Sequence, residues 1–174
     1  MAATVADYYL IALRWAHFLA GITWIGLLYY FNFVQVPSFK ELDAGVRNVL
    51  VPKLVRRALR WFRGSAVVTV LAGWTYFFSF WAFNSFRPLT AWSWGLSILA
   101  GGMFGTMMLL NVWGVIWLYQ KKVIAATEGV LKGQPAPAEM PVWGKRATIA
   151  SRFNLVLSLP MLFFMAAASH LAFI

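Results

Sequence analysis

Two histidines and one arginine stand out because they lie within the long apolar stretches of this chain. His17 lies early in the first apolar stretch, His170 lies late in the last one, and Arg14 precedes His17 by three residues. Ionisable side chains are costly inside a bilayer, so those found there are often functional. Imidazole is also a common axial ligand of haem iron. These residues are therefore the candidates for chemistry.

The two histidines are expected at similar depths on one side of the membrane. At 1.5 Å per residue, His17 would lie roughly 10 Å and His170 roughly 6 Å below the outer boundary. Facing helices of a bundle can hold a cofactor between their side chains. We therefore predict that both imidazoles ligate the iron of one b-type haem, with Arg14, on the same helix face as His17, pairing with a propionate. The alternative is an interfacial role for each histidine and a snorkelling arginine.

Several classes of site are excluded by the residues that are missing. The chain has no cysteine, which excludes disulfides, iron–sulfur clusters and covalently attached haem c. None of the apolar stretches contains an acidic residue, so neither a carboxylate proton relay nor a Ser–His–Asp set can be assembled within the membrane. No catalytic residue can be named.

The composition indicates an integral membrane protein. Hydrophobic residues make up 61% of the 174 residues and charged residues 11%, against about 45–50% and about 25% in soluble domains. A membrane-spanning helix needs about 20 mostly apolar residues. Four stretches satisfy this requirement, so we predict an all-α, four-helix antiparallel bundle formed by a single domain, residues 1–174. The predicted spans are approximately residues 8–34, 64–83, 91–119 and 153–174.

The basic residues orient these spans. Thirteen of the fifteen lysines and arginines lie in two segments, 35–63 and 120–152. Basic residues concentrate in cytoplasmic loops, so both segments are expected in the cytoplasm and both termini on the outer side. This pattern predicts a multi-pass membrane protein. It also explains the net charge of +10 through the lipid bilayer as partner, without nucleic acid.

The two basic segments are expected to differ in structure. Residues 52–63 carry basic side chains on one helical face and apolar side chains on the other, which predicts an amphipathic helix lying in the cytoplasmic membrane interface. The basic stripe consists of Lys53, Arg56, Arg57 and Arg60. Segment 120–152 contains three prolines and is predicted to be an irregular cytoplasmic loop.

Four groups of residues are informative when they are taken in order along the chain. They are 17–26 (HFLAGITWIG) with 29–35 (YYFNFVQ), 54–63 (LVRRALRWFR), Asn111–Val112 with Gln120–Lys121–Lys122, and Asn154 with 159–163 (LPMLF) and His170. Together they resemble the membrane domain of the bacterial membrane-bound urate oxidase (urate hydroxylase) family. The resemblance covers most of the chain, although no single group is specific on its own.

The resemblance implies a membrane oxidoreductase module that is coupled to electron transfer by a c-type cytochrome. Full-length family members have a longer membrane domain followed by a C-terminal cytochrome c. This chain ends at Ile174 and has no C-x-x-C-H sequence, so it is expected to be a short, stand-alone member. At most it would be one module of an oxidoreductase, and urate oxidation by this chain alone is not expected.

Two functions follow from these observations. The first is a haem-b redox module that passes electrons to or from a partner at the outer face, such as a c-type cytochrome. The alternative is a non-catalytic accessory or stabilising subunit of a larger membrane complex. A visible absorption spectrum separates the two, because only the first binds a coloured cofactor.

Overall fold

The computed structural model describes residues 4–88 and 94–168. Within these ranges the chain is helical apart from short connections, and no strand occurs, which confirms the predicted all-α class. Four helices are long and apolar enough to cross a membrane. They cover Val5–Glu41, Ala44–Phe83, Gly95–Leu131 and Met140–Ala167.

The first three long helices are each built from consecutive segments, one of which is a π-helical turn. The first contains α1 (Val5–Tyr29), the π segment η1 (Tyr30–Gln35) and α2 (Val36–Glu41). Thr4 begins it with a capping box, in which the Asp7 carboxylate accepts the Thr4 backbone N–H at 2.8 Å. This pairing satisfies a donor that a helix N-terminus leaves free.

The second long helix corrects one expectation. It contains α3 (Ala44–Leu50), the π segment η2 (Val51–Val55) and α4 (Arg56–Phe83). Residues 52–63 are helical, as predicted, but they continue directly into the second span and do not form a separate interfacial helix. Their apolar face, with Leu59 and Phe62, is buried in the core of the bundle. Protein thus covers the face for which we expected lipid.

The second basic segment is also more ordered than its prolines suggested. The third long helix contains α5 (Gly95–Asn111), the π segment η4 (Val112–Ile116) and α6 (Trp117–Leu131). The fourth, α7 (Met140–Ala167), begins 13 residues before the predicted span at 153. The irregular loop predicted for 120–152 is therefore confined to residues 132–139. Pro141 lies in the first turn of α7, a position that lacks a helical N–H partner in any case.

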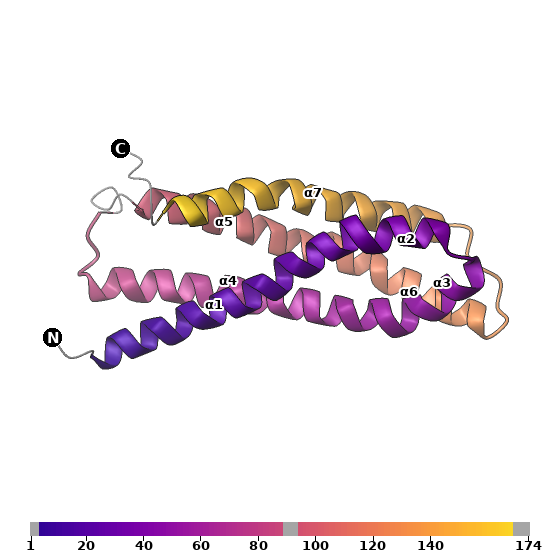
Figure 1. Cartoon of the computed structure of the whole chain (residues 1–174), viewed down its shortest axis with the longest axis horizontal. Helices are drawn as coiled ribbons and strands as arrows, with labels where there is room; N and C mark the ends of the chain where they lie inside the picture. The colour runs from indigo at the N-terminus through magenta and orange to yellow at the C-terminus, as the bar shows by residue number, and fades with distance from the viewer. Residues whose placement is uncertain (1–3, 89–93, 169–174) are drawn as a thin grey trace.

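Figure 1 shows an elongated antiparallel bundle in which α1 runs obliquely across α4. Near its start α1 contacts α4, where the Tyr9 and Ser79 hydroxyls are 3.4 Å apart. Further along it reaches α7, where the Tyr29 and Ser158 hydroxyls are 3.2 Å apart. The core of the bundle is built from large buried side chains of all four long helices. They include Trp24, Leu28, Phe62, Met108 and Val112.

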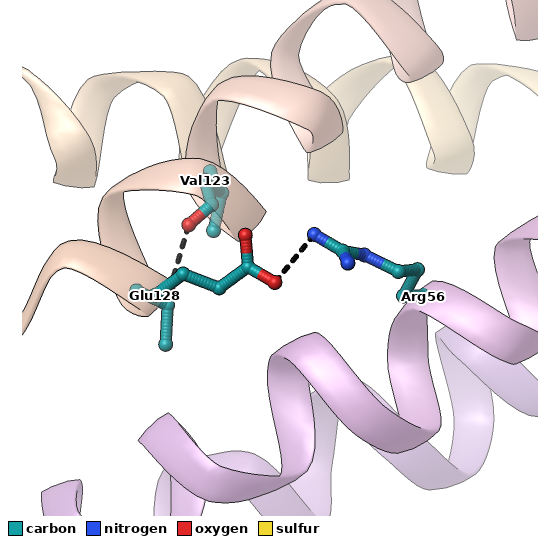
Figure 2. A network of polar contacts seen from close by, with 4 residues as sticks. Arg56, Val123 and Glu128 are labelled. Atoms are coloured by element: carbon teal, nitrogen blue, oxygen red, sulfur yellow. Dashed lines mark hydrogen bonds and ion pairs between the residues drawn. The ribbon is translucent and has the colours of Figure 1, made fainter. Parts of the chain in front are cut away.

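Two arginines of α4 connect it to the third long helix. Arg56 forms an ion pair with Glu128 of α6, with Nη2 and Oε1 2.7 Å apart (Figure 2). The guanidinium carbon of Arg63 lies 3.6 Å from the ring centroid of Trp117, close enough for a cation–π interaction. Both side chains of the ion pair are more than a third exposed, so it contributes little to stability. The pair places one cation of the basic face of α4 beside α6.

Candidate functional site

His17 of α1 is held against α4 by one hydrogen bond. Its Nδ1 lies 2.7 Å from the backbone carbonyl oxygen of Thr69. A carbonyl oxygen can only accept, so Nδ1 carries the proton and donates. In the neutral imidazole the other nitrogen, Nε2, then has a free lone pair. The half-buried His17 ring is therefore oriented with one nitrogen occupied and the other available as a ligand.

Gly73 provides the space for this ring. A Cβ atom at Gly73 would lie 2.7 Å from Nδ1 and 2.8 Å from Cε1 of His17, which is closer than any real contact allows. One turn along α1, Gly21 faces the methyl group of Thr69, with 3.6 Å between that carbon and an added Cβ. The two helices therefore approach closely where the imidazole lies between them.

Arg14 lies one turn before His17, as predicted, and its side chain is exposed. Its guanidinium carbon lies 5.9 Å from the ring centroid of Phe18. That distance permits a weak cation–π contact. The Arg14 charge is thus located beside His17 at the surface of the bundle.

His170 lies outside the residues that the structure describes. Helix α7, which leads to it, ends at Ala167. In Figure 1 the start of α1 and the end of α7 lie at the same end of the bundle but on opposite sides of it. His17 contacts α4. Because His170 lies outside the described residues, the predicted pairing of the two histidines stays a prediction.

A second polar centre joins α5 to α7. Asn111 donates from Nδ2 to Asn154 Oδ1 at 2.7 Å and to the Ala150 carbonyl at 2.8 Å. Asn154, which is fully buried, donates in turn to the Met108 carbonyl at 3.0 Å. These hydrogen bonds connect the two helices through paired amide groups.

Comparison with known proteins gives one result that bears on this architecture. Residues 93–174 match the model of the family described as urate oxidase N-terminal. The match confirms the predicted resemblance over the second half of the chain, which contains α5, η4, α6 and α7. No curated protein and no solved structure gives a significant match.

Only one of the two polar centres lies within the residues that match the urate oxidase N-terminal family. Asn111 and Asn154 lie inside the matched residues, whereas His17 and its contacts in α4 lie before them. The second half of the chain is thus similar to a urate oxidase N-terminal domain, and it contains two of the four helices of the described residues that are long and apolar enough to cross a membrane. The match does not extend to residues 17–35 and 54–63, so their resemblance to the same family stays a prediction.

Thr69 and Gly73 are the site residues whose contact with His17 was not predicted. A backbone carbonyl is present at every residue, so no sequence pattern marks the one at Thr69 as an acceptor. The four-residue spacing of a small threonine and a glycine was the available signal, because such pairs permit close helix approach in membranes.

Proposed function

We propose that this chain is a membrane redox module that binds a b-type haem through His17, with His170 as the second axial ligand. The observation that supports the proposal is the hydrogen bond from His17 Nδ1 to the Thr69 carbonyl. Histidines that bind metals usually donate their second ring nitrogen to a carbonyl or carboxylate, which fixes the tautomer and makes the ligating nitrogen more basic. His17 has this arrangement without a metal-specific sequence motif.

Each residue around His17 has a distinct role in the proposal. The Thr69 carbonyl orients the imidazole, Gly73 makes room for it, and Arg14 offsets the negative charge of a propionate. A bound haem would supply one-electron transfer. The residues present fit such a group, because the ligating nitrogen is free and a cation lies beside it on the same helix.

The family match sets the proposal in a wider context. Membership in a urate oxidase N-terminal family is compatible with oxidoreductase chemistry, while oxidation of urate by this chain alone is not part of the proposal. The partner would be a c-type cytochrome or a larger membrane complex at the outer face. The proposed location is the bacterial inner membrane, with both termini on the periplasmic side.

The test is the visible absorption spectrum of the full chain, expressed with ample haem and purified in detergent. We expect a Soret band that His17→Ala and His170→Ala each shift or abolish. Arg14→Gln should weaken haem retention and leave the band position unchanged, because it removes no ligand. Arg87→Gln, which changes another arginine near the outer end, serves as the control.

The outcomes separate the two functions. A colourless protein would overturn the redox proposal. A band that survives His170→Ala unchanged would retain His17 and exclude His170 as a ligand. The alternative, a non-catalytic accessory subunit, is favoured by the Asn111–Asn154 hydrogen bond, because these amide groups join two helices of the bundle. It predicts a colourless chain that is recovered within a larger membrane complex.

A further inference from the structure

The four long helices surround a small cavity near Gln35, distant from His17 in the chain. Its volume is about 30 Å³, and residues from all four helices line it. A cavity needs about 10–15 Å³ to hold one water molecule, so this one has room for about two. Most of its wall is apolar, and four side chains supply polar groups. They are Gln35, Gln120, Thr148 and Ser151.

Gln35 presents an unpaired acceptor to this cavity. Its side chain is 8% exposed, and its Oε1 atom is buried with no hydrogen-bond partner among the described residues. A buried amide oxygen without a donor is strongly unfavourable, and native proteins pair such atoms with protein or with ordered water. The surroundings of Gln35 must therefore provide a donor.

Ser151 provides half of the required bridge. Its Oγ accepts a hydrogen bond from Asn32 Nδ2 at 2.8 Å, so its own proton remains to be donated. Thr148 donates its hydroxyl proton to the Gly144 carbonyl at 3.0 Å and retains oxygen lone pairs. A water molecule between Ser151 and Gln35 can accept a hydrogen bond from the Ser151 hydroxyl and donate one to Gln35 Oε1. It would thus have the two to four polar partners that an internal water requires.

The backbone around the cavity is unusual in the same place. All three π segments of the described chain reach its wall, through Gln35 of η1, Val55 of η2 and Ile116 of η4. A π turn inserts an extra residue into an α-helix and is frequently found at functional sites. Each insertion rotates the following residues by about 100°, which changes the side chains that the helix presents to the centre of the bundle.

We propose that this cavity is a built water site, in which about two water molecules join Gln35 of η1 to Ser151 of α7. The direct bond from Asn32 to Ser151 and the water-mediated bond from Gln35 then hold the same stretch of the first long helix to α7. The site shares no residue with the proposed haem site, so either proposal can fail without the other.

The experiment is a structure of the full chain in lipid nanodiscs, at a resolution that shows ordered water. We expect density within hydrogen-bonding distance of both Gln35 Oε1 and Ser151 Oγ. A cavity without such density, or a Gln35 amide bonded directly to another side chain, would overturn the proposal.

Thermal unfolding gives a second, independent readout. Gln35→Met keeps nearly the same volume but removes the acceptor. With water bound, it breaks the bridge and should lower Tm. If the cavity were dry, Gln35→Met would raise Tm, because an unpaired buried oxygen would be removed. Gln134→Met changes an exposed glutamine in the connection before α7 and serves as the control. The density in the unmodified protein decides the question if a variant fails to fold.

Discussion

At the scale of single residues, the environment of His17 is set by backbone atoms. In an α-helix the carbonyl of Thr69 already accepts the N–H of Gly73, four residues on. The imidazole uses the second lone pair of that carbonyl, at 2.7 Å. An unpaired ring N–H would be costly within a bilayer, and this bond removes that cost while it fixes the tautomer.

Gly73→Ala tests whether this packing controls the orientation of the ring. The added methyl group would overlap the imidazole, so either the ring or the helix must shift. Overpacking of this kind destabilises by about 1–3 kcal/mol. We expect a lower Tm in detergent and, if the haem proposal holds, a weakened Soret band.

Gly64→Ala is the matched control for this change. It lies in the same helix, α4, and an added Cβ there meets nothing within 4 Å. Replacing glycine by alanine within a helix stabilises by roughly 0.5–1 kcal/mol where space allows. The two variants should therefore move Tm in opposite directions. Equal effects would show that the contact with His17 does not matter.

The sequence identified His17 and Arg14 as candidates because ionisable residues are rare in apolar stretches. It could not identify the acceptor, since the Thr69 side chain is not the group that binds the ring. The crossing of α1 over α4 brings Thr69 and Gly73 to His17, and helix crossings depend on packing over the whole bundle.

At the scale of helices, the presence of four long apolar helices was easier to predict than the fate of the basic segments. The described residues contain four helices that are long and apolar enough to cross a membrane, as predicted. The amphipathic pattern of 52–63 was real, but periodicity shows only that one face is apolar. It does not show whether lipid or protein covers that face. Here Leu59 and Phe62 pack into the core, so the segment extends the bundle.

Proline positions explain the second difference at this scale. Pro135 and Pro137 lie in the connection between α6 and α7, where they interrupt no helix. Pro141 lies at the start of α7, where its fixed φ favours helix formation. Counting prolines in 120–152 predicted a long irregular loop, whereas their spacing leaves room for helix on both sides.

The Asn111–Asn154 hydrogen bond, which joins α5 to α7, gives a prediction at the helix scale. Asn154→Ala removes the acceptor for Asn111 and the donor to the Met108 carbonyl. Because the site is fully buried, no bulk water replaces these bonds, and we expect a loss of about 1–3 kcal/mol. Unfolding in detergent, followed by circular dichroism, measures it.

Two further variants make that result specific. Asn111→Ala and the double variant complete a thermodynamic cycle, in which the two losses should be less than additive because the residues share one bond. Asn48→Ala, in the partly exposed helix α3, is expected to change stability little. Strict additivity of the two core changes would contradict a direct Asn111–Asn154 interaction.

At the scale of the whole molecule, charge and shape agree. In Figure 1 the start of α1, the end of α4, the start of α5 and the end of α7 lie at one end of the bundle, with α2, α3 and α6 at the other. The elements at this second end belong mostly to segments 35–63 and 120–152, which hold thirteen of the fifteen basic residues. An antiparallel arrangement of four spans therefore separates an end rich in positive charge from an end that contains little.

This separation predicts the orientation of the protein in the membrane. Lysine and arginine residues near span ends are retained on the cytoplasmic side, so the end with α2, α3 and α6 should face the cytoplasm. Alkaline phosphatase fused after Ile174 should then be active, and green fluorescent protein fused there should be dark. Fusions after Gln134, in the connection before α7, should give the opposite pair of results. Because one span separates the two fusion points, each reporter must be active at one point and inactive at the other. Cytoplasmic activity after Ile174 would invert the bundle and move His17 and Arg14 to the inner side, away from any periplasmic electron-transfer partner.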